Sequence, residues 1–434
     1  MHRLIVSLFV FSLVVTPAVA QNAREKKVRD DKIKVEGDGF WIYNDLPKAF
    51  AEAKAKSKPV VVVLRCIPCE ECVKLDDELV DQNPTLRPLL DNFVRVRVVS
   101  TNGLDLSLFQ FDTDQSFAVF FLNADGAIYG RYGTRSHRTN WVGDVSIEGL
   151  AKAMAGALDL HKDYPKNKAV LAVKRGPAPA FPVPEKFPAL SKYGSTLAAT
   201  GNIVQSCIHC HQIGDAVKSY YRQRKEVMRD DVLFPYPHPK SLGLILDPKE
   251  RASVTKVEAD TPAANAGFLT GDVIRTLAGH PLLSPADVQW ALHRADAGGA
   301  KLPAVVSRGG KEVTVTLSLP AGWRQRDDIS WRASAWGLRR MVTGGMLLET
   351  PEDAPKNGMA LRAKHVGQYG PHAAAKVAGF LAGDVIVSFD GKTDLLRETD
   401  LFAYALRKTK PGDKIAVEIL RNGKPMMMTL PMQE

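Results

Sequence analysis

Residues 260–274 read DTPAANAGFLTGDVI, and the pattern returns at residues 369–386 as YGPHAAAKVAGFLAGDVI. Both copies contain Ala-Gly-Phe-Leu and end in Gly-Asp-Val-Ile. Each copy is followed by a helix-like stretch and then by two alternating strands, which meet at residues 308–311 and 421–424. A pattern that repeats together with its flanking elements indicates two homologous domains in the C-terminal half of the chain.

The repeat resembles bacterial PDZ domains of the kind attached to exported proteases. The resemblance implies that a peptide or protein C-terminus pairs with a sheet edge, while its carboxylate meets backbone N–H groups of a loop. We expect PDZ domains over residues 241–320 and 334–434, with groove helices over 286–295 and 400–408. The carboxylate loops are expected at Leu242, Gly243 and Leu244 in the first domain and at Trp336, Gly337 and Leu338 in the second. The alternative is a PDZ domain that only packs against its neighbours.

The N-terminal half centres on residues 60–64, VVVVL, a β-branched run typical of a strand buried on both faces. Cys66, Cys69 and Cys72 follow this run directly and lead into a helix-like stretch. Further along are an alternating strand, a hairpin signal and a closing helix. This order of elements resembles the thioredoxin-like fold family over residues 35–160. The predicted fold is therefore a multidomain mixture of α/β and α+β units.

The thioredoxin-like resemblance implies a role for each cysteine of this cluster. Cys69 takes the position of the attacking thiol and Cys72 that of the resolving thiol, while Cys66 is additional. A helix N-terminus stabilises a thiolate, whereas the carboxylates of residues 70 and 71 raise thiol pKa values. Either Cys66/Cys69 or Cys69/Cys72 can be the working pair. We expect thiol–disulfide exchange, with a structural disulfide or a bound metal as the alternative.

A second cysteine cluster, CIHCH at residues 207–211, matches the attachment pattern of c-type haem. Two thiols three residues apart on one helical turn would both face the haem vinyl groups, and His211 would ligate the iron. Cys207 and Cys210 are thus expected to bind haem c covalently. Met228 or His238 could supply the sixth ligand. Zinc or a disulfide is the alternative, and one metal site joining both clusters would require the intervening proline-rich segment to fold back.

The N-terminus predicts export. A short basic start, an apolar run and Ala-Val-Ala at residues 18–20 are typical of a cleavable signal peptide over residues 1–20. We therefore expect a periplasmic or extracellular protein without a membrane span after cleavage, and an uncleaved anchor is the alternative. Residues 22–34 form a charged leader expected to be disordered. The net charge of +10 is dispersed along the chain, so we expect no nucleic-acid partner.

The modules follow one another in a fixed order along the chain. Residues 161–194 are rich in proline and predict an extended linker, followed by the CxxCH segment at 195–240. The whole arrangement resembles a bacterial family described as thioredoxin-like and PDZ domain-containing (seleno)proteins, some of which carry selenocysteine at a thiol position. The resemblance implies thiol redox chemistry linked to peptide recognition, and it leaves the redox partner unspecified. A non-enzymatic PDZ scaffold is the alternative. An HtrA-like protease is excluded because no Gly-x-Ser-x-Gly or similar nucleophile context is present.

Overall fold

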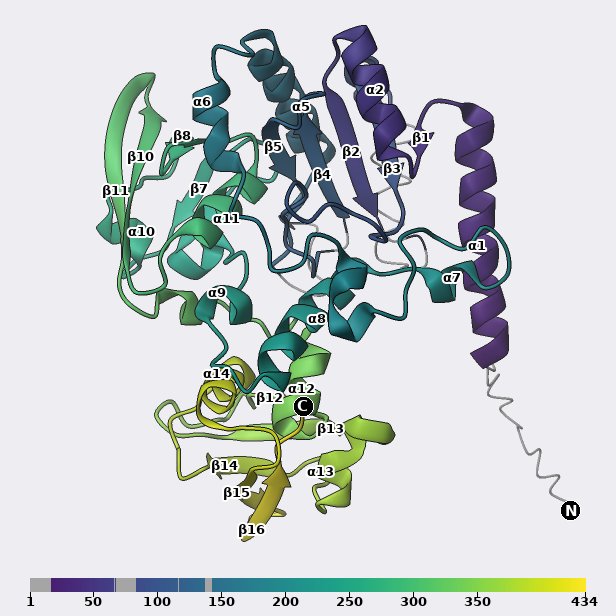
Figure 1. Ribbon diagram of the computed structural model, residues 1–434. Coiled ribbons are helices and arrows are strands. Elements are labelled where there is room, and N and C mark those ends of the chain that lie inside the picture. The colour runs from purple at the N-terminus through teal and green to yellow at the C-terminus, as the bar shows by residue number, and fades with distance from the viewer. Residues whose placement is uncertain (1–16, 66, 68–82, 116, 137–142) are drawn as a thin grey trace, which may run out of the picture.

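The computed structural model describes residues 17–65, 67, 83–115, 117–136 and 143–434, with side chains from residue 23 onward. Figure 1 shows the N-terminal unit next to the first repeated domain, with the second repeated domain below both. Most of the expected signal peptide lies outside the described residues. So do the three cysteines of the first cluster.

A five-stranded sheet forms the centre of the N-terminal unit, in the order β1-β3-β2-β4-β5 (Figure 1). The strands are β1 (Ile42–Tyr43), β2 (Val60–Arg65), β3 (Val94–Val98), β4 (Phe117–Leu122) and β5 (Ile128–Tyr132). β3 runs parallel to β1 and β2, whereas β4 is antiparallel to β2 and β5. All residues of β2 are buried, as the unbroken apolar run predicts.

The two faces of this sheet are covered by different helices. Alternate residues of β2 pack with α2 (Leu46–Lys56) on one face and with α5 (Ile147–Lys162) on the other. α2 begins with Pro47 in its first turn and is capped by Asp45, whose side chain accepts a hydrogen bond from the Lys48 N–H. α4 (Arg87–Leu90) precedes β3.

The charged leader is helical rather than disordered. α1 (Pro17–Asp38) packs against α7 (Ile203–Ser206) and β1, burying Val28 and Val35. Glu25 on α1 accepts hydrogen bonds from the N–H groups of Ile203 and Val204 and thereby caps α7. The leader prediction was wrong because composition does not reveal these tertiary partners.

The proline-rich segment is not an extended spacer. It contains α6 (Lys168–Leu171) and three short 3₁₀ turns, and it folds back over the thioredoxin-like sheet. Leu171 packs into the core on the α5 side, while Phe187 and Leu190 pack into the core on the α2 side. Apolar side chains between the prolines account for this packing, because an extended linker would leave them in water. α8 (Cys210–Gln223) and α9 (Asp230–Leu233) follow.

The first repeated domain contains two small sheets and a long helix. One sheet pairs β6 (Leu244–Leu246) with β7 (Val254–Val257), and the other has the order β11-β10-β8-β9. The remaining elements are α10 (Pro262–Asn265), β8 (Val273–Leu277), β9 (His280–Pro281), α11 (Pro285–Arg294), β10 (Ala300–Arg308) and β11 (Lys311–Leu319). α11 packs on β5, and Leu283 belongs to the hydrophobic core of the thioredoxin-like unit. The first repeated domain therefore shares part of its hydrophobic packing with the N-terminal unit.

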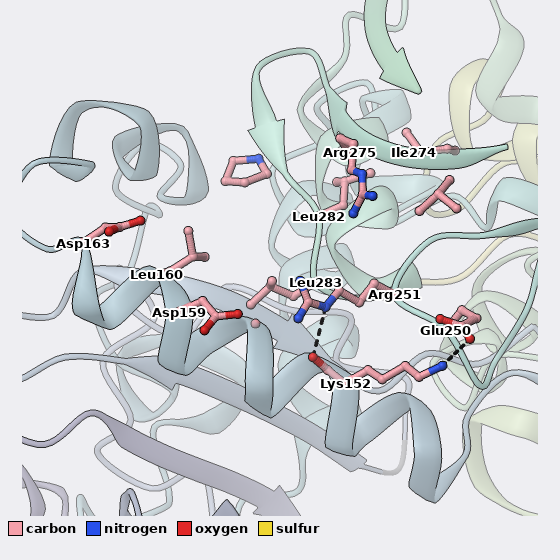
Figure 2. Close-up of a pocket in the computed structure, with 13 residues that line it drawn as sticks. Lys152, Asp159, Leu160, Asp163, Glu250, Arg251, Ile274, Arg275, Leu282 and Leu283 are labelled. Carbon is pink, nitrogen blue, oxygen red and sulfur yellow. Dashed lines mark hydrogen bonds and ion pairs between the residues drawn. The ribbon is translucent and has the colours of Figure 1, made fainter. Parts of the chain in front are cut away.

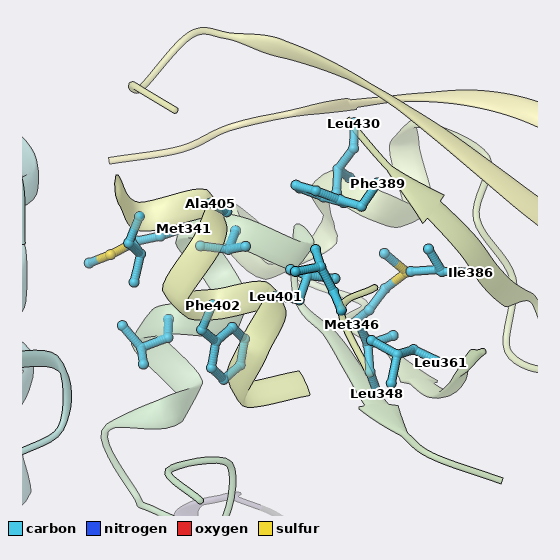
Figure 3. Packing of buried hydrophobic residues seen from close by; sticks show 14 of the residues in the cluster. Met341, Met346, Leu348, Leu361, Ile386, Phe389, Leu401, Phe402, Ala405 and Leu430 are labelled. Atoms are coloured by element: carbon cyan, nitrogen blue, oxygen red, sulfur yellow. The ribbon is translucent and has the colours of Figure 1, made fainter. Parts of the chain in front are cut away.

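The second repeated domain contains one five-stranded sheet, β12-β13-β14-β15-β16. Its elements are α12 (Ala335–Thr343), β12 (Met346–Glu349), β13 (Leu361–Val366), α13 (Ala374–Val377), β14 (Val385–Phe389), α14 (Glu398–Lys408), β15 (Lys414–Arg421) and β16 (Lys424–Pro431). Figure 3 shows part of its core, where Leu361 and Ile386 of the sheet face α14.

The repeated Gly-Asp pair has the same structural task in both copies. Asp272 binds the guanidinium of Arg308 at 2.8 Å and accepts a hydrogen bond from the Leu269 N–H at 2.9 Å. Asp384 makes the equivalent contacts with Arg421, at 2.7 Å, and with the Leu381 N–H. The motif that reveals the repeat thus ties the turn before one strand to the hairpin between two others.

Candidate functional site

Cys66, Cys69 and Cys72 lie outside the described residues, but two of their neighbours, Arg65 and Ile67, are described. Arg65 ends β2 directly before Cys66, and Ile67 lies in a buried apolar cluster with Val28, Val99 and Ile203. Ile67 therefore lies just past the C-terminal end of β2, in contact with the segment that directly follows β3. This is the edge where the thioredoxin-like resemblance places the reactive thiols.

Two buried arginines lie at this edge. Arg65 is 4% exposed and Arg97 is fully buried, and both approach Asp31 of α1, at 3.6 Å and 3.1 Å. Burial, followed by the charge of Asp31, raises the pKa of Tyr43, so this phenol stays protonated. Guanidinium groups beside a thiol favour the thiolate. The sequence does not identify these arginines as site residues, because a strand pattern does not show which charged side chains are buried.

The second cysteine cluster docks on the loop after β3. The Ile208 carbonyl accepts hydrogen bonds from the N–H (3.1 Å) and the hydroxyl (2.7 Å) of Thr101, and the Ile208 N–H donates to Asn102 Oδ1 at 2.8 Å. Ile208 is completely buried in the core on the α2 side. The CxxCH segment is therefore part of the thioredoxin-like unit and lies beside the strand end from which the first cluster departs.

Cys207 and Cys210 have different surroundings. Cys207 is buried, its Sγ lies 3.9 Å from the Val99 carbonyl oxygen, and burial raises the pKa of its thiol. Cys210 is partly exposed and is the first residue of α8. Residues 207 and 209 have extended backbone conformations, so the expectation that both thiols share one helical turn was wrong. The hydrogen bonds of Ile208 to Thr101 and Asn102 hold this stretch outside the helix.

The expected haem ligands lie in three separate environments. His211 is half-exposed on α8, with its Nδ1 3.6 Å from Asp215 Oδ2. Met228 is buried in the core of the second repeated domain. His238 is buried near Asp144 and accepts a hydrogen bond from the Lys240 N–H, and burial lowers its pKa to about 4. Met228 and His238 therefore serve structural contacts and are not brought to His211.

The described residues do not fit a haem c site as a set. Thioether formation needs both sulfur atoms at one open face, whereas Cys207 is buried with its Sγ against the Val99 carbonyl. Within the described ranges, no three His, Cys, Asp or Glu side chains converge in a way that could hold a metal ion.

In the first repeated domain the residues expected to form the carboxylate loop lie between a 3₁₀ turn ending at Leu242 and strand β6. Leu242, Gly243 and Leu244 are all buried. Tyr236 covers the groove helix α11: its ring stacks on His293 at 4.1 Å, and its carbonyl accepts a hydrogen bond from Gln289. This loop and helix are therefore enclosed by the chain itself.

In the second repeated domain the predicted loop was wrong. Trp336, Gly337 and Leu338 lie inside helix α12, and the turn before β12 is formed by Gly344 and Gly345, with φ of 62° and 91°. Glycine tolerates this left-handed backbone without a steric penalty. The Gly-Gly pair directly before an apolar strand, matched to Gly243 before β6, was the signal that could have located the loop.

A cavity of about 360 Å³ lies between α5 and the first repeated domain (Figure 2). Leu160, Leu282 and Leu283 form its apolar side. Lys152 bridges its rim, because it pairs with Glu250 while its carbonyl accepts a hydrogen bond from Arg251 Nε at 3.0 Å. The rim carries both acidic and basic groups, so its charge selects no single class of ligand.

These features define the classes of domain in the chain. Residues 41–124 match the family model described as thioredoxin-like, and residues 227–319 and 365–431 match the PDZ domain model. The chain thus combines a thioredoxin-like domain with two PDZ domains, each built around one copy of the repeat.

Curated relatives match through about two fifths of this chain. One is the "Probable periplasmic serine endoprotease DegP-like" of Pseudomonas fluorescens, 28% identical over 184 residues, which are 42% of this chain and 38% of the relative. Another is the "Regulator of sigma-E protease RseP" of Escherichia coli, 26% identical over 42% of this chain and 36% of the relative. The chain thus spans well under half the length of the curated relatives it matches.

A solved HtrA-type protease with a decapeptide aligns with 38% of this chain and 49% of its own, at 16% identity and a TM-score of 0.21.

Among the described residues, the structure has no helix both long and apolar enough to cross a membrane.

Proposed function

We propose that this chain is an exported thiol redox protein whose PDZ domains bind the C-terminus of a peptide or protein partner. The thioredoxin-like fold supports the first part and the PDZ domains support the second. The periplasmic designation of the DegP-like relative supports export to the periplasm. In this proposal Cys69 attacks, Cys72 resolves and Cys66 supplies a third thiol.

One observation carries the proposal: the second cysteine pair lies beside the strand end that leads into the first. Cys207 Sγ is 3.9 Å from the Val99 carbonyl, and Val99 packs in the same cluster as Ile67, the residue after Cys66. A structural clip needs only two thiols, whereas a second pair beside the strand that leads into Cys66 suits exchange between the two pairs.

Cys210 is the member of the second pair suited to attack. It occupies the first position of the 14-residue helix α8, where backbone N–H groups and the helix dipole favour a thiolate. Its attack on a disulfide within residues 66–72 forms a mixed disulfide and releases one thiolate. Cys207 then displaces the remaining sulfur, so two electrons and two protons pass to the first pair and a Cys207–Cys210 disulfide forms.

Disulfide mapping tests this proposal. The exported chain is equilibrated in glutathione buffers of stepped potential, quenched with acid and alkylated, and its linkages are identified by mass spectrometry. We expect interconverting disulfides within and between the two clusters, and Cys69→Ser should abolish exchange in the first cluster. Cysteines that stay in one state at every potential would support the scaffold alternative and contradict the proposal.

Covalent haem at Cys207 and Cys210 stays a separate prediction. Expression in a host with c-type maturation machinery, followed by a visible spectrum, tests it directly. A Soret band that disappears in Cys207→Ala/Cys210→Ala would establish haem attachment. Haem attachment would also remove Cys207 and Cys210 from thiol exchange, because thioethers do not react with disulfides.

A further inference from the structure

The groove of the second PDZ domain is closed by the helix that precedes it. α12 packs against both β12 and α14, the strand and the helix between which a PDZ ligand lies. Leu338, Met341 and Val342 of α12 are buried in the same apolar core as Phe402 and Ala405 of α14. Figure 3 shows Met341 beside Ala405 and Phe402. α12 therefore supplies the apolar contacts that a ligand side chain would make.

β12 is an edge strand, and its Leu348 presents its backbone N–H away from the sheet. β12 pairs only with β13 among the described strands, and Leu348 lies opposite Ala363. The N–H of Ala363 donates to Asp384 and its carbonyl accepts from Gly383, so both groups face away from β12. Opposite residues in an antiparallel pair share this orientation, so Leu348 faces the open edge.

The outward N–H of Leu348 is already occupied. Glu398, the first residue of α14, accepts a hydrogen bond from it at 2.8 Å. The same carboxylate binds Arg339 of α12 through Nε at 3.0 Å and Nη2 at 2.6 Å, and both side chains are nearly fully buried. A bidentate pair of this kind is strong and geometrically specific. Glu398 thus joins β12, α14 and α12 in one clasp.

The loop that would meet a ligand carboxylate is occupied too. The Gly345 N–H donates to the carbonyl of Arg339 at 2.9 Å. A carboxylate bound at this turn would need that N–H group, because PDZ loops bind the chain end through backbone donors. One residue of α12 therefore supplies both the cation of the clasp and the acceptor that fills the loop.

We propose that α12 is an intramolecular inhibitor of the second PDZ domain, held by the Arg339–Glu398–Leu348 clasp and displaced by a peptide with a free C-terminal carboxylate. The peptide strand would pair with β12, its carboxylate would take the Gly345 N–H, and its apolar side chains would replace those of α12. This inference rests on peptide binding by the PDZ domains, which is part of the proposed function.

The first PDZ domain lacks this clasp. Aligning Asp287 with Asp400 places Pro285 at the position of Glu398, and proline has no carboxylate. Tyr236 instead covers α11 there, through the contacts with His293 and Gln289 described above. The releasable charge pair is thus particular to the second domain.

α12 is also anchored to the thioredoxin-like domain at its N-terminal end. Ser334 donates from its N–H (2.7 Å) and from its hydroxyl (2.8 Å) to the two carboxylate oxygens of Asp114, and Lys218 of α8 binds the Ser334 hydroxyl. Release of the clasp can therefore free the C-terminal end of α12 without detaching the helix from the molecule.

Hydrogen exchange of the full chain tests closure without any ligand. Arg339→Met removes the clasp while retaining an apolar side chain, and Glu398→Gln keeps an acceptor for Leu348 but loses the charge. We expect amide exchange in α12 and at Leu348 to rise about tenfold or more in both variants, with β15 unchanged. Arg362→Met, which removes the exposed Arg362–Glu349 pair of the same sheet, is the matched control and should leave α12 unchanged.

Peptide binding tests the inhibitory role. The probe is a pool of fluorescein-labelled decapeptides of random sequence with a free C-terminal carboxylate, and the same pool as C-terminal amides is the control. We expect the carboxylate pool to bind Arg339→Met about tenfold more tightly than the parent chain, because more molecules have an open groove. The idea is overturned if folded variants with protected β15 show unchanged α12 exchange. Faster exchange without peptide binding also overturns it, and it leaves the thiol part of the proposed function untouched.

Discussion

Lys174 and Asp287 form an ion pair, Nζ to Oδ2 at 2.9 Å, in which neither side chain has any exposed surface. Lys174 comes from the proline-rich segment and Asp287 from α11 of the first PDZ domain. The Asp287 carboxylate also accepts hydrogen bonds from the N–H groups of Leu283 and Arg131. The pair therefore binds the folded-back segment, strand β5 and the PDZ helix at a single carboxylate.

Removal of the lysine should destabilise the protein strongly. Lys174→Met leaves the Asp287 charge buried without its cation, and breaking one partner of a buried pair costs about 3–5 kcal/mol. Denaturant unfolding followed by tryptophan fluorescence measures the free energy of unfolding. Lys168→Met, at an exposed lysine of the neighbouring helix α6, is the control and should change it by less than about 0.5 kcal/mol. Equal effects of the two variants would contradict a role for the buried pair.

Gly149 on α5 should not tolerate alanine, although alanine normally favours a helix. A Cβ at this position would lie 2.2 Å from the backbone carbonyl oxygen of Pro248 in the first PDZ domain. Gly149→Ala must therefore push the two domains apart, and we expect a lower melting temperature and a loss of about 1–3 kcal/mol. Gly143→Ala is the matched control, since among the described residues no atom beyond the chain neighbours lies within 4 Å of a Cβ at this position. Calorimetry of both variants measures the difference, and an unchanged Gly149→Ala would refute the close approach.

Cys210 should react with iodoacetamide at least about tenfold faster than Cys207 near neutral pH. Cys210 has a helix N-terminus and partial exposure, whereas burial raises the pKa of the Cys207 thiol and shields it from reagents. A chain with Cys66, Cys69 and Cys72 changed to serine isolates the two thiols. Time-resolved alkylation read by peptide mass spectrometry gives both rates, and comparable rates would contradict the assignment of Cys210 as the attacking thiol.

His293 should make the protein less stable in acid. Burial, then Arg324, lowers the pKa of His293 from 6.5 to about 3. The unfolded chain therefore binds a proton that the native state excludes, and the stability is lost as the pH falls from 6.5 toward 3. The slope approaches about 1.4 kcal/mol per pH unit within this window.

The variant His293→Phe keeps an aromatic ring against Tyr236 but cannot take up a proton. Burial also raises the pKa of Asp327, to about 7. The stability that this group contributes is lost as the pH rises, so its effect on the free energy of unfolding opposes that of His293. The difference between variant and parent isolates His293. Unfolding measured at pH 4, 5, 6 and 7 should show a shallower loss of stability in the variant, and parallel curves would contradict the prediction.

Elements whose pattern is local could be predicted from the sequence. The apolar run of β2 and the Gly-Asp of each repeat predicted the thioredoxin-like and PDZ folds, because burial on both faces and a tight turn leave direct marks on residue type. The turn directly before β6 lies at the residues expected for the first carboxylate loop, and its role in binding stays a prediction. The loop before β12 was misplaced, because Trp336-Gly337-Leu338 imitates a loop motif while its neighbours form the amphipathic helix α12.

Features that depend on distant partners could not be predicted. α1 is polar along most of its length and is ordered by contacts with Arg97 and α7. The proline-rich segment is ordered because Leu171, Phe187 and Leu190 reach apolar cores built from other parts of the chain. The clasp joins Glu398 to Leu348, 50 positions earlier in the chain, and to Arg339, 59 positions earlier. No local sequence pattern marks contacts between residues so far apart.

Leu283 lies within the first PDZ domain by sequence, yet its side chain completes the core of the thioredoxin-like domain. Excision of residues 241–320 as a separate fragment would consequently remove part of the core of the thioredoxin-like domain and expose apolar surface on both fragments. The two units should melt together in a single thermal transition, and a mild protease should release neither one intact. In this chain the sequence boundary between the two domains does not coincide with a boundary between separate hydrophobic cores.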